Sequence, residues 1–142
     1  KKIKKNEDLD AEAEKLIGEI IKEKNNSDFV FITLYPWEKK PFYQMRDPKN
    51  KKVTKSFDLV YKGVEISSGS QREHNYDVLK EQSKEKGIDI DKMSFYADIF
   101  KYGAPAHGGA GIGFDRLIQR MLNLENVREA ILLPRDPERL TP

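Results

Sequence analysis

The sequence predicts an α+β domain in which one mostly antiparallel sheet is flanked by helices. Apolar residues recur at helical spacing in several segments, and short β-branched and aromatic runs lie between turn signals. The chain of 142 residues has the length of one domain with a real core, and no internal repeat or domain linker is visible.

The first part of the chain predicts one helix and one strand. Asp8 or Asp10 can cap a helix that runs to about Lys24, with an apolar stripe formed by Leu9, Ala13, Leu16, Ile17, Ile20 and Ile21. Residues 29–35 are β-branched and aromatic without polar alternation, which predicts a buried central strand. Residues 46–55 are almost free of apolar side chains, so we expect a solvent-facing loop there.

A hairpin and two helices are expected next. Residues 57–66 predict a β-hairpin that turns near Lys62-Gly63. Residues 72–87 predict a polar helix, and Asp91 is expected to cap another helix, which ends near Gly103.

The last part of the chain predicts a glycine-rich strand, a helix to about Leu124 and a short buried strand at residues 130–133.

Composition excludes several classes of protein. A net charge of +2 is too small to indicate nucleic-acid binding by itself. The chain has no cysteine and only two histidines, which excludes disulfides, thiolate zinc sites and a histidine-rich metal site. No apolar stretch approaches membrane-spanning length and no signal peptide is visible, so we expect a cytoplasmic protein that does not engage a membrane.

The glycine-rich segment at residues 108–113 is the most informative feature, because four glycines fall within it and Asp115-Arg116 follow. Bare backbone permits close approach of a flat or phosphorylated ligand, and a helix start with an arginine favours anions. The segment therefore predicts a nucleotide site, although its spacing matches neither the dinucleotide fingerprint nor the phosphate loop. Alternatively, the glycines only mark a tight crossing of strand and helix.

The predicted hairpin carries a second chemical signal. A turn at Lys62-Gly63 makes Asp58 and Glu65 diagonal neighbours, and two close carboxylates favour a hard divalent cation such as Mg²⁺ with phosphate oxygens. Arg72, where the second strand ends, has the geometry to grip a carboxylate bidentately. The alternative is that both acids pair with surface lysines and that Arg72 is simply exposed.

Together these segments resemble a class II aminoacyl-tRNA synthetase, namely the C-terminal half of its catalytic domain. Residues 109–117 resemble motif 3, the strand-to-helix element that holds ATP. The match is closest to the aspartyl and asparaginyl subclass of archaeal and eukaryotic type, and it is carried by Phe42-Tyr43, residues 65–72, residues 105–109 and residues 133–136.

This resemblance implies roles for individual residues in ATP binding. Arg116 clamps the γ-phosphate, while Gly113, Phe114 and Asp115 shape the nucleotide site. Glu65 and Arg116 are the residues expected to carry catalysis.

The resemblance also implies a metal site and an amino-acid site. Glu65 ligates Mg²⁺ with Ser68, and Asp58 contributes. Arg72 pairs with the side-chain carboxylate of aspartate, with Ser68 and His107 nearby. The hairpin register places Ser67, not Ser68, on the face of Glu65, so the role of Ser68 requires a bulge near Gly69.

The implied activity is that of an aspartate–tRNA ligase, which uses aspartate, ATP, Mg²⁺ and tRNA and is a homodimer at full length. Residues 1–142 hold motif 3 but not motifs 1 and 2 or the anticodon-binding domain, so we expect a fragment with little or no activity alone and an exposed hydrophobic face. The alternatives are an asparaginyl-tRNA synthetase or asparagine-forming paralogue, and a non-catalytic module that binds nucleotide or a partner.

Overall fold

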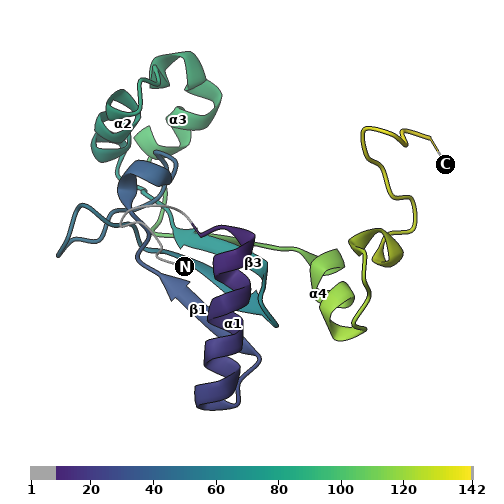
Figure 1. Ribbon diagram of the computed structural model, residues 1–142. Coiled ribbons are helices and arrows are strands. Elements are labelled where there is room, and N and C mark those ends of the chain that lie inside the picture. The colour runs from purple at the N-terminus through teal and green to yellow at the C-terminus, as the bar shows by residue number, and fades with distance from the viewer. Residues whose placement is uncertain (1–8, 142) are drawn as a thin grey trace. The chain divides into compact units, whose positions relative to one another are not determined.

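A computed structural model describes residues 9–141 of the chain, and the predicted capping residue Asp8 lies outside them. Four strands form one antiparallel sheet in the order β1-β2-β3-β4, and helices accompany it, which confirms the predicted α+β class (Figure 1). The elements are α1 (Ala11–Asn25), β1 (Phe29–Thr33), η1 (Trp37–Lys39), β2 (Ser56–Tyr61), β3 (Val64–Gln71), α2 (Tyr76–Glu85), η2 (Ile90–Met93), α3 (Ser94–Lys101), β4 (Gly108–Ile112), α4 (Phe114–Met121) and η3 (Val127–Ala130). No helix among the described residues is long and apolar enough to cross a membrane.

The described residues divide into two compact units. Residues 32–58 and 68–111 form the first, which we call the helical unit because it contains α2 and α3. Residues 9–31, 59–67 and 112–141 form the second, which we call the hairpin unit because it contains the turn between β2 and β3.

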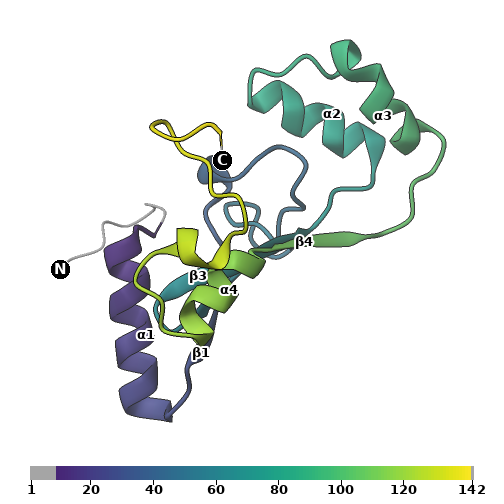
Figure 2. The same cartoon turned by 90° about the vertical axis from the view of Figure 1, so that its right-hand side faces the viewer.

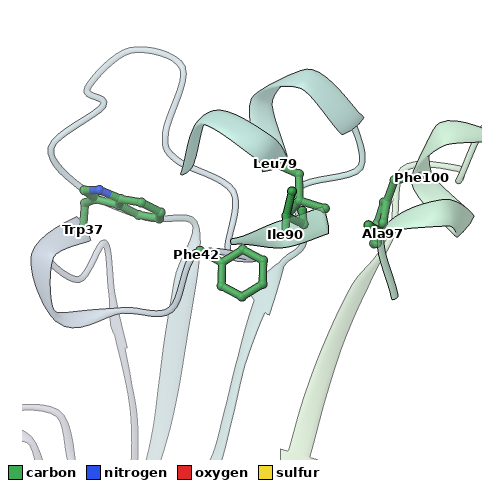
Figure 3. Close-up of a cluster of buried hydrophobic side chains, with 6 residues drawn as sticks. All are labelled: Trp37, Phe42, Leu79, Ile90, Ala97 and Phe100. Atoms are coloured by element: carbon green, nitrogen blue, oxygen red, sulfur yellow. The ribbon is translucent and has the colours of Figure 1, made fainter. Parts of the chain in front are cut away.

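The helical unit has a well-buried core. Helices α2 and α3 lie side by side in both views (Figures 1 and 2). Their inner faces meet aromatic residues of the connection that follows β1, in the cluster of Trp37, Phe42, Leu79, Ile90, Ala97 and Phe100 (Figure 3). Leu79 at its centre has no exposed surface. A cluster of this kind is the main source of a unit's stability.

The helix boundaries in this unit differ from the prediction. Helix α2 begins at Tyr76, because β3 continues to Gln71 and Arg72 forms a bridge with Gln44. Asn75 caps α2, because its side chain accepts from the backbone N–H groups of Asp77 and Val78. The capping role predicted for Asp91 was wrong: the Asp89 side chain caps η2, and α3 continues from that short helix without a side-chain cap.

The polar segment at residues 46–55 is not solvent-facing throughout. Thr54 is fully buried, and its polar groups are satisfied there. Its N–H donates to Tyr35 O at 2.8 Å, and its Oγ1 lies 2.7 Å from Ser56 Oγ. A polar side chain tolerates burial when its hydrogen-bonding groups are satisfied, which composition alone does not reveal.

The hairpin unit contains the predicted first helix and the predicted turn. Asp10 caps α1 by accepting from Ala13 N at 2.8 Å, and Asn26 ends the helix in the left-handed region with φ 52°. The turn at Lys62 and Gly63 has φ of 46° and 76°, the mirror-image type of two-residue turn that suits twisted strands. These predictions are confirmed.

Strand β1 is not the buried central strand that its composition predicts. It is the first strand of the described sheet, and its residues alternate between exposed and half-buried. Phe29 stacks on Tyr61 with 4.4 Å between ring centroids, yet it is 49% exposed, and Phe31 is 63% exposed. A continuous apolar run is typical of strands covered on both faces, but the described residues leave one face of β1 exposed.

The strand predicted at residues 130–133 is also absent from the described structure. Ala130 ends the short helix η3, and the next residues are bends in which Leu132 is 94% exposed and Leu133 is 53% exposed. Helix α4 ends at Met121, three residues before the predicted end. The apolar run forms no strand because no described strand pairs with it.

Candidate functional site

The glycine-rich segment forms the predicted strand-to-helix element. Strand β4 carries Gly108 to Ile112, all of them exposed, and α4 follows from Gly113. The N–H of Gly113 donates to Ile66 O at 2.7 Å, and no side chain caps the helix. The start of α4 therefore retains backbone N–H groups that favour negative charge.

The packing of the described residues does not explain the whole glycine run. A Cβ at Gly111 would meet nothing within 4 Å, and one at Gly109 would come no closer than 3.5 Å to Arg72 Nη2. Gly69 differs, because a Cβ there would lie 2.7 Å from both Gly109 O and the Phe57 ring. Within the run at residues 108–113, a Cβ would lie 3.3 Å from Ser70 O at Gly108 and 3.4 Å from Ile66 O at Gly113. The alternative of a tight crossing thus finds support at these two glycines but not at Gly109 or Gly111.

In the hairpin unit, three predicted site residues come together. Arg116 Nη1, in the first turn of α4, donates to the backbone oxygen of Glu65 at 3.1 Å. The N–H of Glu65 donates to Oε2 of Glu14 at 2.9 Å. Gly113 is joined to the residue after Glu65 by the bond already described. Phe114 and Asp115 open the same helix, and both are exposed.

In the helical unit, Arg72 and His107 lie together. The N–H of Arg72 donates to His107 O at 3.0 Å. The Arg72 guanidinium donates from Nη1 to Ser70 Oγ at 2.7 Å and from Nη2 to Gly109 O at 3.5 Å, and it lies 4.9 Å from the centre of the Tyr43 ring. These contacts orient the guanidinium beside the glycine strand. Arg72 is half-buried, so the alternative of a simply exposed arginine does not describe it.

Aromatic residues surround this arginine. The His107 ring stacks on Phe100 with 6.2 Å between centroids, and its Nδ1 lies 2.9 Å from Pro105 O. Burial raises the pKa of the Tyr96 hydroxyl, and the positive charge of Arg72 opposes that shift. The phenol therefore stays protonated, as a neutral neighbour of Arg72.

The helical unit holds two predicted metal ligands, Asp58 and Ser68, which differ in exposure. Ser68 is exposed, whereas Asp58 is buried with its Oδ2 3.8 Å from Lys40 Nζ. That ammonium also lies 3.8 Å from the centre of the Tyr35 ring. The pairing with lysine that the sequence left open for Asp58 is therefore present, although the lysine is largely buried.

No group of three or more His, Cys, Asp and Glu side chains within residues 9–141 has the arrangement of a protein-only metal site. Mg²⁺ does not need such a group, since one or two carboxylates and substrate phosphates suffice.

Sequence reasoning missed the residues that hold the predicted ones. Glu14, Ser70 and Lys40 each contact a predicted site residue. None of the three stands in a spacing that signals this role. Tyr43 and Ser70 were part of the resemblance, but their contacts with Arg72 needed the structure.

The comparison with protein families defines the class. Residues 1–137 match the family model described as tRNA synthetases class II (D, K and N), and the chain belongs to this family.

The relatives narrow the class further. The chain is 53% identical to the aspartate–tRNA(Asp/Asn) ligase of Aeropyrum pernix over 142 residues, which are 100% of this chain and 32% of that protein. It is 46% identical over 136 residues to the cytoplasmic aspartate–tRNA ligase of Rattus norvegicus, covering 96% of this chain and 27% of that protein. The chain thus spans about a third of the length of the curated relatives that it matches.

Solved structures of the same class of enzyme superpose on this chain. The aspartyl-tRNA synthetase of Entamoeba histolytica superposes with a TM-score of 0.95 at 37% identity, over 100% of this chain and 29% of that one. The asparaginyl-tRNA synthetase of Pyrococcus horikoshii superposes with a TM-score of 0.89 at 35% identity, over 99% of this chain and 33% of that one.

Proposed function

We propose that this chain is the motif 3 part of the catalytic domain of an aspartate–tRNA ligase. The observation that carries the proposal is the identity of about half of all residues with aspartate–tRNA ligases along the entire chain. Two separate sets of contacts support it: Arg116 donates to the backbone of Glu65 in the hairpin unit, and Ser70 accepts from Arg72 in the helical unit.

ATP is expected to bind at the start of α4. Arg116 would donate to γ-phosphate oxygens, and the N–H groups of the uncapped helix start would favour the same charge. Gly113 permits close approach, and Phe114 with Asp115 would border the nucleotide. The open space beside Gly111 supports this assignment, since described residues do not fill it.

Aspartate is expected to bind beside Arg72. A guanidinium that is already oriented by Ser70 and Tyr43 loses little freedom when it pairs with a carboxylate. His107 and Ser68 would border this amino-acid site, as the resemblance implies.

The donor set fits Mg²⁺, which prefers hard oxygen ligands. The carboxylate of Glu65 and the hydroxyl of Ser68 would hold the ion. Asp58, whose Oδ2 lies 3.8 Å from Lys40 Nζ, would be a further ligand. When bound, Mg²⁺ would neutralise phosphate charge as pyrophosphate leaves.

The proposed reaction has two steps. An oxygen of the α-carboxylate of aspartate attacks the α-phosphorus of ATP, which forms aspartyl-adenylate and releases pyrophosphate. A hydroxyl of the terminal ribose of tRNA then attacks the activated carbonyl and releases AMP. The residues of this chain would position substrates and neutralise charge, so no protein nucleophile is required.

Aspartate-dependent exchange of pyrophosphate into ATP tests this function. The longest natural form of the protein that carries these residues should support exchange. Arg116→Gln should lower its kcat about 10²-fold, because one preorganised donor to developing charge is removed. Arg128→Gln, which removes a pair with Asp136 outside the proposed site residues, is the matched control and should leave the rate unchanged. Absence of aspartate-dependent exchange would contradict the proposal, and ATP binding without exchange would favour a non-catalytic module.

Asparaginyl-tRNA synthetase is the second candidate, because an enzyme of that name superposes with a TM-score of 0.89. The oriented guanidinium of Arg72 favours aspartate, since a charged hydrogen bond contributes about 1.5–3 kcal/mol. Calorimetric titration with aspartate and with asparagine should therefore show tighter binding of aspartate, and the reverse order would favour the asparaginyl enzyme.

The partners follow from the same proposal. We expect tRNA as the second substrate, a homodimer at full length and a cytoplasmic location like that named for the Rattus norvegicus relative.

A further inference from the structure

The peptide unit of Glu65 is held from two helices within the hairpin unit. Its N–H donates to Glu14 Oε2 of α1 at 2.9 Å. Its carbonyl oxygen accepts from Arg116 Nη1 of α4 at 3.1 Å. The two bonds restrain the backbone from which the Glu65 side chain projects.

Helix α1 is itself seated closely on the hairpin. A Cβ at Gly18 would lie 2.7 Å from Gly63 N, and a Cβ at Gly63 would lie 3.0 Å from Lys15 Cα. The backbones of helix and turn therefore approach more closely than side chains would permit. Glu14 stands one helical turn before Gly18, so this contact determines where its carboxylate reaches the strand.

Glu14 also differs from the other acids of α1. Glu19 and Glu23 are exposed, whereas Glu14 is half-buried and directed at a backbone donor of β3. The length of the Glu14 side chain determines whether its oxygen reaches this donor, 51 residues away in the sequence.

We propose that Glu14 is a positioning residue for Glu65: from α1 it fixes the strand segment that presents the metal-binding carboxylate. The inference rests on the proposed function, in which Glu65 ligates Mg²⁺. In this role Glu14 would act on the metal through the backbone of Glu65. Its reach, more than its charge, is what the strand requires.

Amide hydrogen exchange of Glu65 tests whether Glu14 restrains the backbone of Glu65. This measurement needs neither metal nor activity. In the longest natural form of the protein that carries these residues, Glu14→Ala should speed the exchange of this amide about tenfold or more, because the hydrogen bond of the amide is lost. Glu14→Gln keeps an oxygen at the same reach and should retain most of the protection. Glu14→Asp keeps the charge but is one methylene shorter, so it should behave like the alanine variant. Glu19→Ala is the matched control on the same helix and should have no effect.

A Mg²⁺ titration in the presence of ATP, followed by the NMR shift of the Glu65 amide, tests whether this restraint supports metal binding by Glu65. The Mg²⁺ concentration at half-saturation should rise about fivefold or more in Glu14→Ala and Glu14→Asp, and less than about twofold in Glu14→Gln.

The outcomes are distinguishable. Unchanged protection of Glu65 in the alanine variant, or lost protection with an unchanged Mg²⁺ response, would overturn the inference. A response that follows charge instead of reach, with the aspartate variant like wild type and the glutamine variant impaired, would also overturn it. If the longest natural form of the protein that carries these residues shows no response to Mg²⁺ with ATP, the metal role in the proposed function fails, and the positioning role fails with it. Should the alanine variant not fold, the glutamine and aspartate variants decide alone.

Discussion

The molecule has two regions that bury their apolar residues to different extents, namely the cluster under α2 and α3 and the segment from α4 onward. In the helical unit, α2 and α3 cover one another and the aromatic connection, and Leu79, Ile90 and Ala97 are at most 2% exposed. In the hairpin unit, α4 and the segment after it leave apolar side chains open to solvent, and Met121, Leu122 and Leu132 are 54%, 64% and 94% exposed. Both regions carry comparable apolar patterns in the sequence.

The difference separates helix formation from burial. The spacing of Phe114, Leu117, Ile118 and Met121 is helical, and α4 does form. The same spacing predicts a covered face, but none of these residues of α4 is buried within the described structure. An apolar surface of this kind favours association or docking.

The largest effect is expected at the centre of the buried cluster. Leu79→Ala should lower the free energy of unfolding by about 2–5 kcal/mol, because a fully buried side chain leaves a cavity. Leu122→Ala, with the same chemistry at an exposed position of the other unit, should cost less than about 0.5 kcal/mol. Urea unfolding, followed by circular dichroism and by the fluorescence of Trp37, measures both. An equal cost at Leu122 would show that its face is covered in solution.

A smaller effect distinguishes two glycines of the helical unit. Gly69→Ala should destabilise by about 1–3 kcal/mol, since the added Cβ would lie 2.7 Å from Gly109 O and from the Phe57 ring. Gly111→Ala should leave stability nearly unchanged, because the space beside it is open. Under the proposed function, however, Gly111→Ala should weaken ATP binding, which calorimetry measures. Unchanged ATP affinity in that variant would count against the glycine strand as the nucleotide site.

The smallest effect concerns an ion pair on α2. The hydrogen bond from Arg46 lowers the pKa of the Glu85 carboxyl, and the Trp37 indole N–H also donates to it at 3.3 Å. A carboxyl whose pKa is lowered by folding stabilises the protein above its unfolded-state pKa, and this contribution is lost as the pH falls through the folded-state value.

Because the Glu85 side chain is 44% exposed, its contribution should stay below about 1 kcal/mol. Thermal melts from neutral into acidic pH should show that Glu85→Gln removes this small pH-dependent difference, whereas Glu81→Gln, four residues earlier on the same helix, should not. Identical pH profiles for wild type and Glu85→Gln would show that the pair contributes nothing measurable.

Much of the local structure was predictable because its causes are local. Asp10 caps α1, and the Lys62-Gly63 turn joins β2 and β3, as capping and turn chemistry require. The failures at β1 and at residues 130–133 share one cause. Both are apolar runs whose state depends on what pairs with them or covers them, and that is not written in the run itself.

The candidate site divides in the same way. Arg116, Glu65 and Arg72 were predicted from local spacing and from resemblance, but their supporting contacts come from distant segments. Glu14 lies 51 residues before Glu65, and Tyr43 contacts Arg72 from the connection between β1 and β2.

By itself, the sequence determined the α+β class, the first helix, the hairpin turn and the glycine strand that leads into α4, because short-range sterics and hydrogen bonds decide these. Only the tertiary structure decided which apolar faces are covered, which lysine pairs with Asp58 and which acid holds Glu65. Each of those outcomes depends on contacts between segments that are far apart in the sequence, so the local pattern around one residue does not determine its partner.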